Sequence, residues 1–517
     1  MQNAKVAVCM RDITKTFGPV VANDRIGLDI HRGEILALLG ENGSGKTTLM
    51  NMLAGIYYPD AGQIFVDGRE VSIRSPKDAY DLGIGMIHQH FKLVDVFTAA
   101  ENIILGIKDA GRSLDLKTVG EKIRAICDMY GFDVDPNQKV YDMSVSQKQT
   151  VEIVKVLYRG ADILILDEPT AVLTPQETEK LFAILRNMRD DGKAIVIITH
   201  KLHEVEEISD RVVVLRRGHC VGEKITKETN AAEMTNMMVG RPVSLNIDRP
   251  GPVAPKPRLI VDGLTVRDAD GMVKLADVSF TAFSGEILGI AGISGCGQKE
   301  LLEAIAGLQD FESGSIRYID PDTGKEIELV GKDPREIFDL GVTLAFVPED
   351  RLGMGLVGSM DLTDNMMLRS FRNGRIIFTD RKKPLQLAER VVRELSVDTP
   401  GLSTPVRRLS GGNVQKVLVG REISSSPTVL MTAYAVRGLD INSSYTIYDL
   451  LNQQKQKGVA VIYVGEDLDV LLELCDRILV LCGGRVSGIV PGRGADKNEV
   501  GLMMTRLGGV QCNESTY

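Results

Sequence analysis

GEILALLGENGSGK at residues 33–46 returns as GEILGIAGISGCGQ at residues 285–298, with the final lysine replaced by glutamine. The apolar start of each stretch predicts a buried strand, and the glycine-rich half predicts a loop that opens a helix. A second segment repeats as well, because SDRVVVLRRGHCVG at 209–222 recurs as CDRILVLCGGRVSG at 475–488. The chain therefore carries one folding unit twice.

A proline-rich stretch separates the two copies. DRPGPVAPKPR at residues 248–258 holds four prolines in eleven residues, which excludes a helix interior or a central strand. We therefore expect a first domain at 1–247, a linker at 248–257 and a second domain at 258–517. Within each copy, short β-branched runs alternate with helical patterns, which is typical of an α/β unit with a mainly parallel sheet. Residues 95–160 are rich in helix formers and predict a helical insertion.

The composition is that of a globular protein and narrows the classes of function. No stretch reaches the ~18 consecutive apolar residues that a membrane helix requires, and no signal peptide is evident, so we expect a cytoplasmic protein. The net charge of −9 argues against broad nucleic-acid binding. The seven cysteines show no paired spacing, and we expect free thiols.

GENGSGKTT at residues 40–48 fits the phosphate-loop pattern G-x-x-x-x-G-K-[ST] directly after a predicted strand. The glycines let backbone amides wrap a phosphate chain, the lysine meets the terminal phosphates, and the first threonine presents its hydroxyl to Mg²⁺. The residues that we expect to bind the phosphates are Gly40, Asn42, Gly43, Gly45, Lys46, Thr47 and Thr48.

ADILILDEPT at residues 161–170 is an apolar strand that ends in the acidic pair Asp167-Glu168. An acidic pair at the carboxyl end of a strand, beside a phosphate loop, suits one carboxylate that orders Mg²⁺ and one that activates water. The alternative is a solvated turn, and the phosphate loop upstream disfavours it.

The order of these elements closely resembles an ATP-binding-cassette ATPase: phosphate loop, Gln89 in GMIHQHF, a serine motif near 144, DEPT, then His200 in IVIITH. The resemblance implies two tandem P-loop NTPase domains, each with a RecA-like core, an antiparallel β subdomain and a helical subdomain. It also implies ATP and Mg²⁺ as cofactors. By resemblance, Gln89 contacts Mg²⁺ or the attacking water, His200 touches the γ-phosphate, and Phe17 stacks on adenine.

The second copy has lost the residues that this chemistry needs. Against the first copy, a glutamine replaces the lysine, neutral residues replace the acidic pair, and a glutamate replaces the histidine. We therefore expect the second copy not to hydrolyse ATP. The altered positions are Gln298, Lys299, Glu349, Ala433, Tyr434 and Glu466.

The serine motif follows the opposite pattern, since LSGGN at 409–413 is close to the family form LSGGQ whereas the first copy has MSVSQ at 143–147. In the family, two cassettes pack head to tail, and each ATP lies between the phosphate loop of one and the serine motif of the other. The resemblance therefore implies one complete site, in which the first-copy residues meet Ser410, Gly411 and Gly412. The pairing can occur within one chain or between two copies of the chain.

Tandem cassettes with a degenerate second half resemble the importers of ribose-like sugars and of nucleosides. GIGMIHQHFKLVDVFTAAENIILG at 83–106 and DEPTAVLTPQE favour the nucleoside branch. This resemblance implies an ATPase at the cytoplasmic face of the cell membrane, two integral-membrane permease subunits and an extracytoplasmic solute-binding lipoprotein. Import of simple sugars is the alternative. A soluble tandem-cassette ATPase acting on ribosomes or DNA, or a scaffold without turnover, is more remote.

Overall fold

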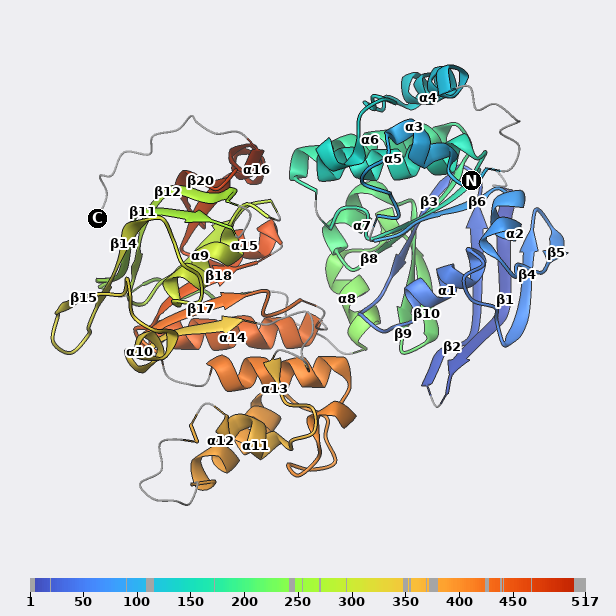
Figure 1. The fold of residues 1–517 in the computed structure, drawn as a ribbon. Coiled ribbons are helices and arrows are strands. Elements are labelled where there is room, and N and C mark those ends of the chain that lie inside the picture. Colours follow the sequence, from blue (N-terminus) through green and yellow to red (C-terminus); the bar gives the residue numbers. More distant parts are fainter. Residues whose placement is uncertain are drawn as a thin grey trace. The chain divides into compact units, whose positions relative to one another are not determined.

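The computed structural model describes residues 5–505 except 19, 90, 108–115, 172, 241–246, 253, 269–270, 294, 347–351, 353–354, 369, 372–379, 424–426, 438, 440 and 466. The chain divides into two compact units, Met1–Ser244 and Leu245–Tyr517. Figure 1 shows that each unit combines sheets with surrounding helices.

The first unit contains two sheets. A four-stranded antiparallel sheet has the order β2-β1-β4-β5, and a six-stranded sheet has the order β10-β9-β3-β8-β7-β6. The six-stranded sheet is parallel except for the edge strand β10, which runs antiparallel to β9. The strands are β1 (Val6–Phe17), β2 (Val20–His31), β3 (Glu34–Leu39), β4 (Ala61–Val66), β5 (Arg69–Val71), β6 (Ile84–Ile87), β7 (Ile163–Asp167), β8 (Ala194–Thr199), β9 (Arg211–Arg216) and β10 (His219–Ile225).

Helices follow most strands of the parallel sheet, as crossover connections require. The helical insertion predicted from the sequence is confirmed by α3, α4 and α5, which lie together at one end of the unit (Figure 1). The helices are α1 (Lys46–Leu53), α2 (Pro76–Asp81), α3 (Ala99–Ile104), α4 (Leu116–Tyr130), α5 (Val145–Tyr158), α6 (Pro175–Asp190), α7 (Leu202–Ile208) and α8 (Ala231–Val239).

The parallel sheet is buried on both faces. In β3, Leu36 and Leu38 belong to the apolar cluster that includes the antiparallel sheet and α1. Ile35, the residue before Leu36, belongs to a second cluster, which includes residues of α3, α5 and α6. Successive residues of a strand point to opposite faces, so a strand with two buried faces reads as a continuous apolar run. This explains why EILALL carries no polar alternation, and the core holds the end of β3 rigidly where the glycine loop begins.

The second unit repeats this topology. Its sheets have the orders β12-β11-β14-β15 and β20-β19-β13-β18-β17-β16. The strands are β11 (Pro257–Arg267), β12 (Val273–Phe283), β13 (Ile287–Ala291), β14 (Ser313–Ile319), β15 (Glu326–Glu328), β16 (Val342–Phe346), β17 (Val429–Ala433), β18 (Ala460–Val464), β19 (Arg477–Cys482) and β20 (Arg485–Pro491). The helices are α9 (Gln298–Ile305), α10 (Pro334–Asp339), α11 (Leu362–Met367), α12 (Lys382–Glu394), α13 (Gly411–Ile423), α14 (Ile441–Gln456), α15 (Leu468–Leu474) and α16 (Lys497–Thr505).

Part of the predicted linker packs against the second unit. Ile247, expected to end the first domain, is 5% exposed in an apolar cluster of the second unit. The backbone oxygen of Asp248 accepts a hydrogen bond of 2.9 Å from Asn452 Nδ2, and Arg249 donates to the backbone oxygen of Cys475. Pro257 is the first residue of β11. The proline spacing marks the end of the first copy but does not reveal these anchors or the start of β11 at Pro257.

Across the described ranges, none of the helices combines the length and the apolar character that crossing a membrane requires. The six cysteines of those ranges, Cys9, Cys127, Cys220, Cys296, Cys475 and Cys482, are free thiols, as the sequence predicts.

Candidate functional site

The glycine loop of the first unit joins β3 to α1, and two of its glycines have no alternative. Gly45, directly before α1, has φ of 98°, and a Cβ there would lie 2.4 Å from the backbone oxygen of Ala22. A Cβ on Gly40 would lie 2.3 Å from the backbone oxygen of Leu215. Neither position has space for a side chain, so the glycines keep the loop tight, and such a loop can turn backbone amides toward a ligand.

Lys46 lies at the centre of this loop. Its ammonium group donates hydrogen bonds to the backbone oxygens of Gly40 at 2.6 Å and Glu41 at 2.9 Å, and the residue is only 6% exposed. Burial lowers the pKa of Lys46, although the carboxylates of Glu168, Asp167 and Glu41 act in the opposite direction. A buried cation held by neutral carbonyls is poised to bind a phosphate.

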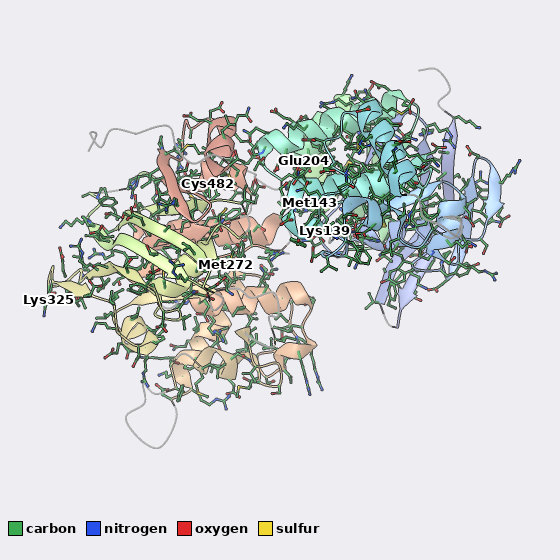
Figure 2. All side chains as sticks on the ribbon, turned by 45° about the horizontal axis from the view of Figure 1, so that its top comes forward. Lys139, Met143, Glu204, Met272, Lys325 and Cys482 are labelled. Carbon is green, nitrogen blue, oxygen red and sulfur yellow. The ribbon has the colours of Figure 1, made fainter. Side chains whose placement is uncertain are left out.

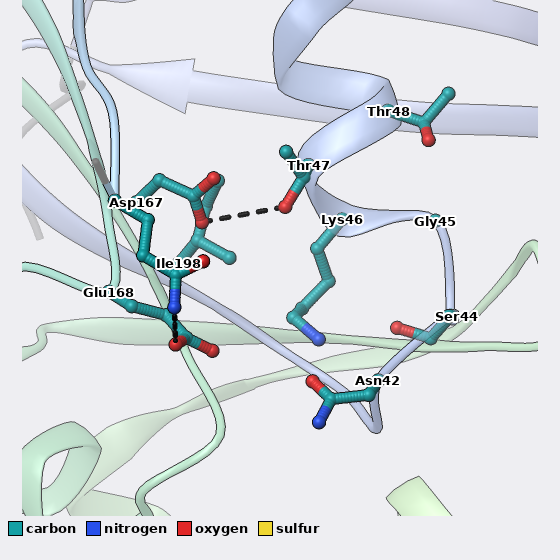
Figure 3. A pocket seen from close by; sticks show the side chains of 11 residues that line it. Asn42, Ser44, Gly45, Lys46, Thr47, Thr48, Asp167, Glu168 and Ile198 are labelled. Carbon is teal, nitrogen blue, oxygen red and sulfur yellow. Dashed lines mark hydrogen bonds between the residues drawn. The ribbon is translucent and has the colours of Figure 1, made fainter. Parts of the chain in front are cut away.

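Asp167 ends β7 and faces Thr47 across the loop. Thr47 Oγ1 donates to Asp167 Oδ1 over 3.4 Å, as Figure 3 shows. Burial, followed by the neighbouring Glu168 carboxylate, raises the pKa of Asp167 to about 6. A hydroxyl and a carboxylate beside a phosphate loop are oxygen ligands of the kind Mg²⁺ takes, usually together with substrate phosphates. These residues therefore fit Mg²⁺.

Glu168 is held by two side chains from other elements. His200 Nδ1 lies 2.8 Å from Glu168 Oε1, and Gln89 Nε2 donates to Glu168 Oε2 over 2.9 Å. Burial alone would raise the pKa of Glu168, but the hydrogen bond and charge of His200, with the nearby lysines, lower it overall. The backbone of Glu168 is strained, with φ of 47°. The carboxylate is thus kept ionised and oriented, as a group that accepts a proton from water must be.

The glycine loop, the acidic pair Asp167-Glu168 and Gln89 line one pocket of about 170 Å³. This is smaller than the about 300 to 1,000 Å³ of typical small-molecule sites, so the pocket has the size for a phosphate group and not for a whole nucleotide. Nine predicted residues line it: Asn42, Gly43, Gly45, Lys46, Thr47, Thr48, Gln89, Asp167 and Glu168. Two further predicted residues lie next to the pocket: Gly40 is bonded to Lys46, and His200 is bonded to Glu168.

Ser44 and Ile198 also line the pocket, and Asn23 supports it, although the sequence motifs predicted none of the three. Ser44 Oγ is buried and has no hydrogen-bond partner in the part of the chain that the structure describes, as expected for a hydroxyl that binds a ligand. Asn23 is fully buried and donates from Nδ2 to the backbone oxygen of Gly45 over 3.1 Å. Ser44 could have been selected by its place inside the loop motif, whereas nothing local marks Asn23.

Phe17 lies at the end of β1 and is 43% exposed, so it is not a core residue. Its ring meets that of Tyr57 edge to face, with centroids 5.2 Å apart. Lys15 Nζ lies 5.6 Å from the centroid of the Phe17 ring. An exposed aromatic ring of this kind can cover the face of a planar base.

The glycine loop of the second unit keeps the backbone of the first. Gly297 precedes α9 with φ of 98°, the value found at Gly45. Gln298 is 5% exposed and donates from Nε2 to the backbone oxygen of Ile293 over 3.2 Å, the counterpart of the bond from Lys46 to Glu41. Leu275, against which a Cβ on Gly297 would collide, takes the place of Asn23. The glutamine fills the site of the lysine without its charge.

The second unit also lacks the acidic pair, although its backbone at these two positions matches that of the first unit. Ala433 ends β17 as Asp167 ends β7, and the next residue, Tyr434, has φ of 56°. The Tyr434 amide donates to the backbone oxygen of Val464 over 3.1 Å, as the Glu168 amide does to that of Ile198 over 2.9 Å. The altered positions Glu349 and Glu466 lie outside the described residues.

The two serine motifs begin equivalent helices. Ser144 precedes α5, and its Oγ accepts a hydrogen bond from the amide of Gln147 over 3.2 Å. Ser410 precedes α13, and its Oγ accepts from the amide of Asn413 over 3.4 Å. A Cβ on Gly412 would meet nothing within 4 Å. Both serines are exposed at a helix N-terminus, where anions are favoured.

Comparison with known proteins agrees with this geometry. The family model described as ABC transporter matches residues 23–171 and again residues 275–432. The nucleoside import ATP-binding protein NupA of Lactococcus lactis subsp. cremoris is 41% identical over 97% of this chain and 98% of its own length. The guanosine import ATP-binding protein NupO of Bacillus subtilis is 43% identical over 96% of each chain. The ribose import ATP-binding protein RbsA 1 of Rubrobacter xylanophilus is 39% identical over 95% of this chain and 96% of its own. With two such matches along its length, the chain belongs to the ABC transporter family and carries the ATP-binding ATPase cassette of that family twice.

Proposed function

We propose that this chain is the ATP-hydrolysing motor subunit of an importer, and that only its first phosphate loop supports hydrolysis. One observation carries the proposal: the Glu168 carboxylate, at the edge of the phosphate pocket, is held by His200 at 2.8 Å and by Gln89 at 2.9 Å. A general base needs an ionised, oriented carboxylate within reach of the attacking water, and this arrangement provides one.

The residues in and around the first loop have different proposed roles. Lys46 and the loop amides bind the terminal phosphates and stabilise the negative charge that grows there during transfer. Glu168 orients a water molecule in line with the γ-phosphate and accepts its proton, while His200 contacts the γ-phosphate oxygens. When bound, Mg²⁺ neutralises charge on the phosphates, and Thr47, Asp167 and Gln89 would hold it. Phe17 stacks on the adenine outside the pocket.

We further propose that Ser410, Gly411 and Gly412 complete this site, within one chain or between two copies. The N-terminus of α13 supports the proposal, because Gly411 and Gly412 allow the backbone a close approach to a phosphate. Val145 and Ser146 stand at the corresponding positions of the first unit and introduce side chains there.

The solutes that we propose the importer carries are nucleosides. Two relatives carry nucleoside or guanosine import in their names, and the HQHF and DEPTAVLTPQE segments favour the same branch. Simple sugars are the second candidate, because the ribose import relative is only slightly less similar. The proposed partners are two membrane permease subunits and an extracytoplasmic solute-binding lipoprotein, which would hold the chain at the cytoplasmic face of the membrane.

The test is reconstitution of the full chain with its permease and binding lipoprotein in vesicles. We expect nucleosides to stimulate phosphate release and to enter the vesicles, while pentoses do neither. The same complex carrying Glu168→Gln is the control for background phosphate release. Stimulation by pentoses alone would refute the nucleoside assignment and keep the importer. Turnover that neither class of solute stimulates would argue against the importer itself.

A further inference from the structure

A buried carboxylate lies behind the proposed catalytic site. Glu204, on α7, is only 2% exposed and is labelled in Figure 2. Its Oε1 accepts a hydrogen bond from Thr170 Oγ1 and lies 3.1 Å from Lys201 Nζ. Its Oε2 accepts from Thr199 Oγ1 over 3.2 Å. A carboxylate is costly to bury without partners, so both of its oxygens are satisfied by groups that the fold brings to it.

These partners come from the two segments that bear the reacting side chains: the turn after β7, and the end of β8 with the residues that follow it. Thr170 follows Glu168 by two residues, while Thr199 and Lys201 flank His200. The two segments are also bonded directly, since Lys201 Nζ donates to the backbone oxygen of Thr170 over 3.4 Å. Glu204 therefore bonds the segment of Glu168 to the segment of His200 from behind.

The second unit has lost this arrangement together with the acidic pair. The positions corresponding to Thr170, Thr199, Lys201 and Glu204 hold Val436, Gly465, Asp467 and Val470. Val436 and Val470 pack against an apolar cluster of that unit. Apolar side chains therefore stand at the positions where the first unit has Thr170 and Glu204.

We propose that Glu204 is a positioning residue for ATP hydrolysis: it fixes the segment of His200 against that of Glu168 and thereby sets their 2.8 Å contact. It acts through His200 and does not touch the nucleotide. The inference rests on the proposed function of the Glu168 site.

The experiment compares Glu204→Gln, which keeps the size, and Glu204→Val, which reproduces the second unit, in the reconstituted full chain. The matched control is Glu206→Gln, an exposed position on the same helix. We expect kcat to fall about 10- to 100-fold in both Glu204 variants, as when second-layer partners or catalytic geometry are disturbed. ATP affinity should stay unchanged, because the phosphate loop is untouched, and Glu206→Gln should match the wild type in both quantities.

The double variant separates positioning from general destabilisation. If Glu204 acts through His200, Glu204→Gln should cost nothing further once His200→Ala has removed the imidazole. Additive losses in the double variant, or a wild-type kcat for Glu204→Gln, would overturn the inference. The proposed function would still stand in that case, provided that the wild type hydrolyses ATP and Glu168→Gln does not. Unchanged turnover in Glu168→Gln would instead defeat the proposed function and the inference with it.

Discussion

The two glycine loops of this chain differ in chemistry and hardly at all in backbone. Gly45 and Gly297 share a φ of 98°, and Glu168 and Tyr434 share a left-handed backbone at φ of 47° and 56°. Yet the first loop presents an ammonium group beside two carboxylates, and the second presents the amide of Gln298. The left-handed backbone persists where tyrosine replaces the glutamate. Strain here therefore belongs to the strand-to-loop turn of the fold and is not by itself a sign of catalysis.

The comparison also indicates which features depend on the charged site. Lysine became a neutral residue of similar length, so the second loop keeps its packing while losing its cation. The serine motif shows the reverse trend, because the second unit keeps the two glycines that the first has replaced. The proposed site, in which the second serine motif completes the first loop, would account for both trends.

The two loops should differ most when the residue at the strained position of each is replaced by glutamine. Glu168→Gln should lower kcat for ATP about 10²- to 10⁴-fold, the usual contribution of a general base, while ATP still binds. Tyr434→Gln is the matched control, because it places the same side chain on the same kind of backbone. Phosphate release by the reconstituted chain measures both variants. Equal losses would show that the second loop also hydrolyses ATP.

A smaller effect is expected from the serines. Ser144→Ala and Ser410→Ala each remove a helix cap, so both should cost about 0.5 to 2 kcal/mol of stability. Only Ser410→Ala should also lower kcat/KM, by about 10- to 100-fold, because a hydrogen bond to a charged group contributes about 1.5 to 3 kcal/mol. Thermal unfolding and ATPase assays separate the two effects. A comparable loss of kcat/KM in Ser144→Ala would contradict the single composite site.

The sequence was sufficient for the parts of this fold that have local signals. Apolar runs and glycine spacing predicted β3, its loop and α1, because those features depend on neighbours in the chain. Contacts between distant segments left no such signal. In the sequence, Glu204 is an ordinary helical glutamate, and only the structure shows its contact with Thr170. The proline-rich linker likewise does not indicate that Ile247 packs against the second unit. The exposure of Phe17 likewise could not be predicted, because it depends on where the pairing of β1 with β2 ends.

Asn23 offers the finest test of the comparison, because the two loops differ there by one buried side chain. Asn23→Leu copies Leu275 and removes the hydrogen bond to the backbone oxygen of Gly45. It also removes Oδ1, which has no hydrogen-bond partner among the described residues, so the stability should hardly change. The loop should hold the phosphates less firmly, and the Kd for ATP should rise about 2- to 10-fold, the equivalent of one ordinary hydrogen bond. Leu275→Asn is the control and should leave the ATP affinity of the first loop as it is. An unchanged Kd in Asn23→Leu would mean that the glycines alone fix the loop, and that the two loops differ in charge but not in rigidity.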